Sequence, residues 1–220
     1  MERQTEVQES YKRGADRYDD LLAIRTWWAK LGCGMVWGFE DTAYAHRMLR
    51  WLPDTFEGKL LDVPVGTALF TAEKYTHMQG ARITCLDYSE DMLAIARRRF
   101  SERGLADIAC VKGDVGSLPF ADGHFDTVLS MNGFHAFPDK DAAFRETARV
   151  LREGGHFIGC FYIRGEKRRT DFFIRRLYVP AGYFTPPFMT KDELTQRLNT
   201  MYREAEIFTV GSIACFRCVK

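Results

Sequence analysis

Three aspartates follow short apolar runs of the sequence, and their spacing is suited to holding a nucleoside. Asp62 ends one run, Asp87 ends the next, and Asp114 comes soon after a third. Asp87 lies twenty-one residues beyond Gly66, a spacing at which a carboxylate can accept hydrogen bonds from both hydroxyls of a ribose. An acid after the third run can accept a hydrogen bond from the exocyclic amine of adenine. Any one of these aspartates could instead cap a helix or a turn, but together they predict a site for an adenosine-containing cofactor.

A histidine is the best candidate for acid–base chemistry. His135 lies just beyond a fourth apolar run, where a substrate should approach, and imidazole titrates near neutral pH. We expect it to act as a general base if the substrate must lose a proton, and the alternative is a buried histidine that only packs. No metal site is expected, because Cys215 and Cys218 stand three residues apart and would point to opposite faces of a strand.

The segments between these residues predict an α/β fold. Strands that are apolar throughout and alternate with helices are typical of a doubly wound parallel sheet with helices on both faces. In such sheets ligands bind beyond the carboxyl ends of the strands, which is where the aspartates and His135 stand. The predicted strands are Lys59–Val63, Arg82–Asp87, Ile108–Val111, Phe125–Ser130 and Gly155–Tyr162, and the predicted helices between them include those opening near Ser89 and at Asp141.

The flanks of this core hold most of the aromatic surface. Residues 1–57 are predicted to form an N-terminal helical cap or lid, and residues 58–220 the main domain, with a substrate-facing insertion at about 163–190. A helix near 191–202 and a final strand near 212–219 complete the chain. These aromatic residues could enclose a small, partly aromatic or lipophilic substrate, or they could merely pack the cap onto the sheet. The expected substrate-pocket residues are Trp27, Trp28, Trp37, Phe134 and Tyr183.

Composition excludes several classes of protein. The chain has 220 residues and a formal net charge of +1, which argues against a general nucleic-acid binder. Between Arg164 and Arg176 six basic and two acidic residues form a positive stretch, either a solvated face or a local anion site. No membrane-spanning helix and no secretory signal are visible, and six scattered cysteines suit a reducing compartment. We expect a cytoplasmic protein that acts on a small molecule, with a homodimer as an open alternative.

The strand-end residues occur within four longer motifs that together resemble one family. The pattern is similar to the class I S-adenosylmethionine-dependent methyltransferases, especially the small-molecule group that includes the ubiquinone and menaquinone biosynthesis methyltransferases. This resemblance implies a Rossmann-like, seven-stranded, mostly parallel sheet with an antiparallel last strand, and S-adenosylmethionine as the cofactor. The motifs are Leu60-Leu61-Asp62-Val63-Pro64-Val65-Gly66-Thr67, Leu86-Asp87-Tyr88-Ser89-Glu90-Asp91-Met92-Leu93, Lys112-Gly113-Asp114-Val115 and Leu151-Arg152-Glu153-Gly154-Gly155.

The resemblance also implies a role for individual residues in cofactor binding. The first loop would approach the methionine part, the acid of the second motif would hold the ribose, and the third motif would read the adenine edge. One departure stands out, since Pro64 and Ala68 occupy positions where two glycines are expected, and only Gly66 remains for close backbone approach. The implied cofactor residues are Tyr11, Tyr18, Asp62, Gly66, Thr67, Asp87, Tyr88, Met92, Asp114, Val115 and Asn132.

Three functions are compatible with these observations. The favoured one is methyl transfer by in-line displacement to a small acceptor, for which the protein supplies alignment and exclusion of water. The first alternative is a regulatory or non-catalytic relative that binds the cofactor without transferring the methyl group. The second is a nicotinamide-dependent oxidoreductase, which fares worse because a G-x-G-x-x-G pattern would fall on Pro64, Gly66 and Leu69 and keep one glycine of three.

Overall fold

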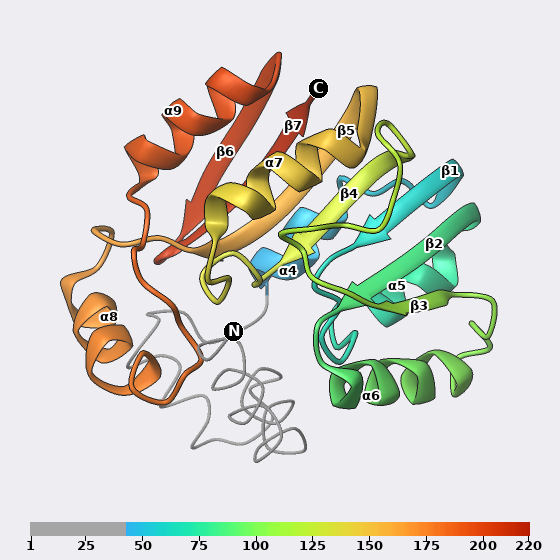
Figure 1. The fold of residues 1–220 in the computed structure, drawn as a ribbon, viewed down its shortest axis with the longest axis horizontal. Helices are drawn as coiled ribbons and strands as arrows, with labels where there is room; N and C mark the ends of the chain where they lie inside the picture. The colour runs from blue at the N-terminus through green and yellow to red at the C-terminus, as the bar shows by residue number, and fades with distance from the viewer. Residues whose placement is uncertain (1–42) are drawn as a thin grey trace.

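Figure 1 shows the computed structural model, which describes residues 43–220 as a twisted seven-stranded sheet flanked by helices. The strands follow the order β3-β2-β1-β4-β5-β7-β6, in which the first five are parallel and β7 is antiparallel to both of its neighbours. The predicted fold class is therefore confirmed. The strands are β1 Thr55–Asp62, β2 Gln79–Asp87, β3 Ala109–Lys112, β4 Phe125–Met131, β5 Leu151–Tyr162, β6 Glu204–Val210 and β7 Ile213–Val219.

Helices cover both faces of the sheet because side chains alternate between the faces along each strand. Leu60 packs in a buried cluster with α4, α5 and α6, while its neighbour Leu61 packs on the opposite face with α7 and α9. The helices are α4 Ala43–Leu49, α5 Thr71–His77, α6 Glu90–Ser101, α7 Lys140–Val150, α8 Arg168–Phe173 and α9 Lys191–Met201, and a π-helix, η1 Ile174–Tyr178, continues α8.

Local sequence signals explain where two of these helices begin. The Ser89 hydroxyl accepts a hydrogen bond from the Met92 amide at 3.4 Å, and acids fill the first turn of α6. Thr190 and Glu193 form a reciprocal capping box at the start of α9. The Ser89 cap places the start of α6 directly after the end of β2, next to the site.

Several predicted bounds shift in the structure. β1 starts at Thr55, four residues before the predicted strand, and β7 matches the predicted final strand closely. β6 was not located from the sequence. The predicted cap falls largely on residues 1–42, which lie outside the described part of the chain. No helix within residues 43–220 is long and apolar enough to cross a bilayer.

Candidate cofactor site

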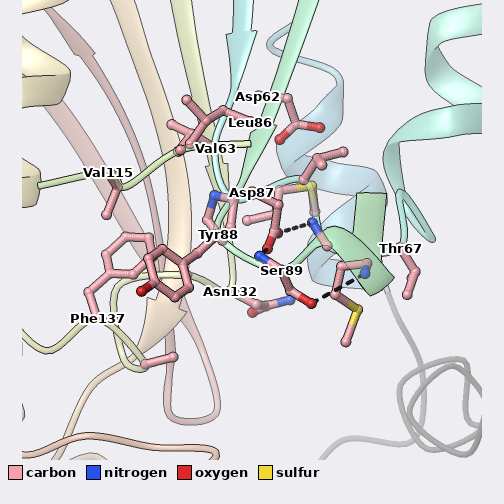
Figure 2. Close-up of a pocket in the computed structure, with 18 of the residues that line it drawn as sticks. Asp62, Val63, Thr67, Leu86, Asp87, Tyr88, Ser89, Val115, Asn132 and Phe137 are labelled. Carbon is pink, nitrogen blue, oxygen red and sulfur yellow. Dashed lines mark hydrogen bonds between the residues drawn. The ribbon is translucent and has the colours of Figure 1, made fainter. Parts of the chain in front are cut away.

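A pocket lies at the carboxyl ends of β1, β2, β3 and β4, where the loops that follow these strands converge (Figure 2). In the view of Figure 2, Tyr88, Val115 and Phe137 gather at one end of the pocket, while Asp62 and Thr67 lie toward the other. The lining is mostly apolar, and its charged side chains are three aspartates. The lining residues are Asp62, Val63, Pro64, Val65, Gly66, Thr67, Leu69, Phe70, Thr71, Leu86, Asp87, Tyr88, Ser89, Met92, Gly113, Asp114, Val115, Met131, Asn132, Gly133, Ala136, Phe137 and Pro138.

The loop after β1 takes a tight path without the expected glycines. Gly66 and Ala68 both have φ near +55°, the left-handed region that favours glycine. For Ala68 this conformation costs roughly 1 kcal/mol. The loop is held by a hydrogen bond from the Val65 amide to the Leu86 carbonyl at 3.0 Å. The loop therefore reaches a glycine-like conformation at the position where the sequence has alanine.

Pro64 is the other residue that stands where a glycine is expected. A glycine on the neighbouring loop makes room for it. A Cβ atom built on Gly133 would lie 2.3 Å from Pro64 Cδ and 2.7 Å from Phe137 Cζ. Because real Cβ atoms do not approach that closely, the proline ring fits only where residue 133 has no side chain. The loops after β1 and β4 thus pack directly against each other in the wall of the pocket.

Asp87 ties the loops after β1 and β2 together. Its Oδ2 accepts a hydrogen bond from the Gly66 amide at 2.8 Å, and its Oδ1 accepts one from the Ser89 amide at 2.9 Å. Burial raises the pKa of Asp87 to about 6, although these amides lower it. Each carboxylate oxygen can accept a further hydrogen bond, so Asp87 can still bind a ligand hydroxyl.

Asp62 is a buried carboxylate with one unsatisfied oxygen. Its side chain is 1% exposed, and Oδ2 accepts a hydrogen bond from the Tyr75 hydroxyl at 2.8 Å. Oδ1 is buried and has no hydrogen-bond partner within the described residues. Burial raises the pKa of Asp62 to about 7, and the Tyr75 hydroxyl opposes that shift. The Thr71 hydroxyl, which also lines the pocket and has no partner among these residues, lies close enough to lower this pKa, so either it or a ligand donor can satisfy Oδ1.

Asn132 fixes the end of β4 from two directions. It has φ near +55°, its amide donates to the Cys160 carbonyl at 2.7 Å, and its Nδ2 donates to the Tyr44 hydroxyl at 3.1 Å. Tyr44 belongs to α4, so this helix contacts the pocket through Asn132.

The third acid, Asp114, forms a turn in which Oδ1 accepts a hydrogen bond from the Gly116 amide at 2.8 Å.

The structure brings together every predicted cofactor residue that it describes. All of them line the one pocket, although they come from loops far apart in the sequence. Five predicted residues, Tyr11, Tyr18, Trp27, Trp28 and Trp37, lie outside the described residues. The residues brought together are Asp62, Gly66, Thr67, Asp87, Tyr88, Met92, Asp114, Val115 and Asn132.

The predicted substrate residues Phe134 and Tyr183 do not line this pocket. Phe134 is fully buried and packs on Phe144 with a ring-centroid distance of 4.2 Å. Tyr183 is half-buried and packs against the core on the α4 side of the sheet. Within the described residues, both aromatic rings contribute to packing rather than to the pocket wall.

His135 also lies outside the lining. It is 6% exposed, its ring stacks on Phe184 at 4.0 Å, and its Nδ1 accepts a hydrogen bond from the Tyr162 amide at 3.4 Å. Burial, with a smaller contribution from Lys140, lowers the pKa of His135 to about 3, so the ring is neutral at physiological pH. His135 therefore lies outside the described pocket wall, and the expectation that it faces the substrate and acts in proton transfer stays a prediction.

Sequence reasoning missed much of the pocket wall after β4. Met131, Ala136, Phe137 and Pro138 line the pocket but carry no polar group that marks them as binding residues. Ser89 was also missed as a lining residue, because its helix-capping role alone explains its presence. The available signal was position, since all of these residues follow a strand end.

Comparison with known proteins identifies the core. The family described as "Methyltransferase domain" matches residues 61–159. Residues 61–159 are therefore similar to methyltransferases. A demethylmenaquinone methyltransferase from Bacteroides fragilis is 30% identical over 119 residues, covering 54% of this chain and 49% of that protein. The ubiquinone/menaquinone biosynthesis C-methyltransferase UbiE from Shewanella woodyi is 34% identical over 123 residues, covering 51% of this chain and 48% of that protein. The predicted resemblance to class I S-adenosylmethionine-dependent methyltransferases is confirmed, and the chain spans about half the length of these relatives.

Solved structures share the fold across most of the chain. A methyltransferase from Thermotoga maritima, described as a possible histamine N-methyltransferase, is 19% identical with a TM-score of 0.71 and covers 97% of this chain and 99% of that one. Geranyl diphosphate methyltransferase in complex with S-adenosylmethionine is 13% identical with a TM-score of 0.63 and covers 81% of this chain and 84% of that one. The [4+2]-cyclase SpnF is 24% identical with a TM-score of 0.59 and covers 76% of this chain and 58% of that one.

The residues present in the pocket of the methyltransferase domain fit S-adenosylmethionine. The unsatisfied oxygen of Asp62 suits the cationic methionine end of the cofactor, and Asp87 retains acceptor capacity for ribose hydroxyls. Met92 and Tyr88 offer apolar surface to a purine ring, and Asp114 lies beside them in the lining. The pocket thus has acceptors and apolar surfaces where the three parts of the cofactor need them.

Proposed function

We propose that this chain binds S-adenosylmethionine in the pocket and transfers its methyl group to a small, neutral, aromatic or lipophilic acceptor. The observation that carries the proposal is the convergence of Asp62, Asp87 and Asp114 on one pocket within the segment that matches the methyltransferase family. When bound, the cofactor supplies an electrophilic methyl group on a sulfonium centre.

The chain's own residues would hold the cofactor at three points. Asp62, with Gly66 and Thr67, would bind the methionine part, and Asp87 would accept hydrogen bonds from the ribose hydroxyls. The purine would lie against Met92 or Tyr88. Asp114 and the Val115 backbone would bind its edge, and Asn132 would shape the wall between the cofactor and the acceptor. For the undescribed residues, we retain the proposal that Tyr11 and Tyr18 close over the cofactor and that Trp27, Trp28 and Trp37 face the acceptor.

The lining supports a neutral acceptor rather than an anion. Within residues 43–220, no lysine, arginine or histidine lines the pocket, and all three charged lining residues are carboxylates. A phosphate or carboxylate on the acceptor would therefore be repelled there. The apolar side chains of Leu69, Phe70, Met131 and Phe137 instead exclude water and match a flat or lipophilic molecule. The names of the quinone-methylating relatives are compatible with such an acceptor.

The proposal also assigns a role to each part of the chain. Residues 1–57 would act as a cap, residues 58–220 as the methyltransferase domain, and the insertion at about 163–190 would face the acceptor. His135, if it acts at all in proton transfer, would need to leave its stack with Phe184. A cytoplasmic location and a homodimer stay predictions.

Calorimetry with S-adenosylmethionine, followed by a mass-spectrometric screen for methylated products, tests the proposal. The screen should compare phenols and quinone precursors with amines, thiols and carboxylic acids of similar size. We expect cofactor binding and products among the neutral aromatic compounds. Binding without any product would favour the non-catalytic alternative. Failure to bind at millimolar concentration would rule out both.

A further inference from the structure

The segment after β5 carries an outer face that the proposed function does not use. α8 and η1 run without a break from Arg168 to Tyr178, and on them Phe172 and Leu177 are 62% and 54% exposed. Within the described residues, the other large apolar side chain with comparable exposure is Tyr88 in the pocket, at 40%. Large apolar side chains that are this exposed, on one short segment, mark an interaction surface.

Four arginines surround Phe172 on this face. Arg168 and Arg169 precede it by four and three residues, Arg175 and Arg176 follow it by three and four, and all four are exposed. In an α-helix, spacings of three and four residues place side chains on one side, so Arg168 and Arg169 share a side with Phe172, and Arg175 and Arg176 follow in the π-helix η1. We call this set of four arginines, with Phe172 and Leu177, the arginine–phenylalanine face.

The same segment is buried on its other side. Thr170 and Ile174 are fully buried, and they anchor the segment to the core of the protein. The acid of this segment, Asp171, turns inward, where it accepts hydrogen bonds from the Tyr162 hydroxyl at 2.6 Å and the Gly165 amide at 3.0 Å. The only acid between Arg168 and Tyr178 therefore lies on the inner side, and the four arginines lie on exposed positions.

α8 stands beyond the carboxyl end of β5, the sheet edge from which the pocket loops also emerge (Figure 1). Arginines with an exposed aromatic and an exposed aliphatic side chain match a surface that offers phosphates above and hydrocarbon below. A nucleic acid would match the arginines and the phenyl ring, but it offers no apolar layer for Leu177.

We propose that the arginine–phenylalanine face docks the protein on the surface of an anionic lipid bilayer. Phe172 and Leu177 insert at the headgroup level, and the arginines contact lipid phosphates. This inference does not depend on the identity of the methyl acceptor. It places the pocket edge of the sheet near the membrane.

Vesicle flotation of the full chain tests the inference, with phosphatidylcholine vesicles that either contain or lack phosphatidylglycerol. We expect binding to the anionic vesicles that weakens as salt is raised. The double variant Arg175→Glu, Arg176→Glu should weaken it roughly a hundredfold, since charge at an anionic surface dominates the attraction. The double variant Phe172→Ser, Leu177→Ser, which keeps every charge, should weaken it about tenfold.

A matched control separates this face from net charge. Arg82→Glu with Arg98→Glu changes the charge equally at exposed positions on β2 and α6 and should leave vesicle binding unchanged. Equal loss in the control, or no preference for anionic vesicles, overturns the proposal. Binding to a single-stranded RNA without vesicle binding assigns the face to nucleic acid. A lower melting temperature in the serine variant, with vesicle binding unchanged, means that the chain itself or a second copy covers the face.

Discussion

Two regions of the chain emerge at the same edge of the sheet: the pocket loops after β1, β2 and β4, and the insertion after β5. They differ in how their polar groups are hydrogen-bonded. In the pocket loops Asp62 keeps a buried oxygen without a partner, and Ala68 and Asn132 adopt left-handed backbone conformations. At the insertion, several buried or half-buried polar groups have partners nearby. Tyr162 donates to Asp171 at 2.6 Å, and the Arg164 guanidinium donates to the Phe188 carbonyl at 2.7 Å.

The two regions meet at a buried lysine. Lys140 Nζ donates to the Phe137 carbonyl of the pocket loop at 3.0 Å and to the Thr185 carbonyl of the insertion at 2.6 Å. Unfilled acceptors and strained backbone are stable only where surrounding structure fixes them. The comparison indicates that the insertion supports the pocket wall, whereas the pocket loops are left incomplete for a ligand.

The largest effect is expected from Asp87→Ala. Removing the carboxylate deprives the Gly66 and Ser89 amides of their acceptor and the ribose of its proposed partner. Cofactor affinity should fall by about a hundredfold or more, and the free energy of unfolding by about 2 kcal/mol. Calorimetry and chemical denaturation measure the two losses. Unchanged cofactor affinity in a folded variant would place the ribose elsewhere.

Gly133→Ala tests the contact between the pocket loops. The new methyl group would collide with Pro64 and Phe137, so we expect a loss of about 2 kcal/mol in the free energy of unfolding. Pro64→Ala should restore part of that loss in the double variant, because it removes the nearer clash. If the two substitutions are additive in a double-mutant cycle, the proposed packing is incorrect.

His135→Ala distinguishes packing from proton transfer on the insertion side. Loss of the ring leaves a cavity beside Phe184, which should cost about 2 kcal/mol of stability. With a packing role, turnover measured well below the melting temperature stays close to wild type. With the base role expected from the sequence, turnover falls while cofactor affinity is spared. The pH profile of turnover decides between them.

Asp62→Asn should stabilise the free protein at neutral pH. Because burial raises the pKa of Asp62 to about 7, the folded state binds a proton that the unfolded state releases near pH 4. The contribution of Asp62 to the free energy of unfolding is therefore fully present below about pH 4. It is lost as the pH rises to about 7, where the folded carboxyl also ionises.

The asparagine variant avoids that loss. Its gain over wild type should grow by about 4 kcal/mol from about pH 4 to pH 7 and then level off, while cofactor affinity falls. Urea denaturation across pH measures it, with Asp91→Asn on the exposed surface of α6 as the control. A gain that does not vary with pH would contradict the assignment to ionisation.

The smallest effect is expected at Ala68. Ala68→Gly relieves the left-handed strain, but it also adds unfolded-state entropy, so the net gain should be about 0.5 kcal/mol. Thermal unfolding measures it, and Ala72→Gly in the helical turn that follows is the control that should destabilise. Destabilisation at Ala68 would mean that its methyl contacts outweigh the strain.

The same comparison explains what the sequence could predict. Asp62, Asp87 and Asp114 were found because each is a charged residue at the end of an apolar strand, and topology brings such ends together. Phe137 and Met131 were missed because an apolar residue in a loop has no feature that separates lining from packing. His135 was singled out because a histidine near a strand end carries a chemical signal whether or not its ring is buried, and its role stays a prediction.

Strand β6, at one edge of the sheet, was harder to predict than the other strands. β6 alternates exposed and half-buried residues over Glu204–Val210, so it lacks the continuous apolar run that marked the central strands. Its partner β7 is buried along most of its length and was predicted. β3, at the opposite edge, was predicted from its apolar residues, so composition rather than edge position decided which strands were found.

The contact between Pro64 and Gly133 also limits the order in which this sequence can change. A proline at position 64 is compatible only with a glycine at position 133, so the glycine must be in place first and cannot be replaced afterwards while the proline remains. The two positions are sixty-nine residues apart in the chain, but they are coupled. Any transfer of the first loop into a related methyltransferase domain therefore has to include both residues.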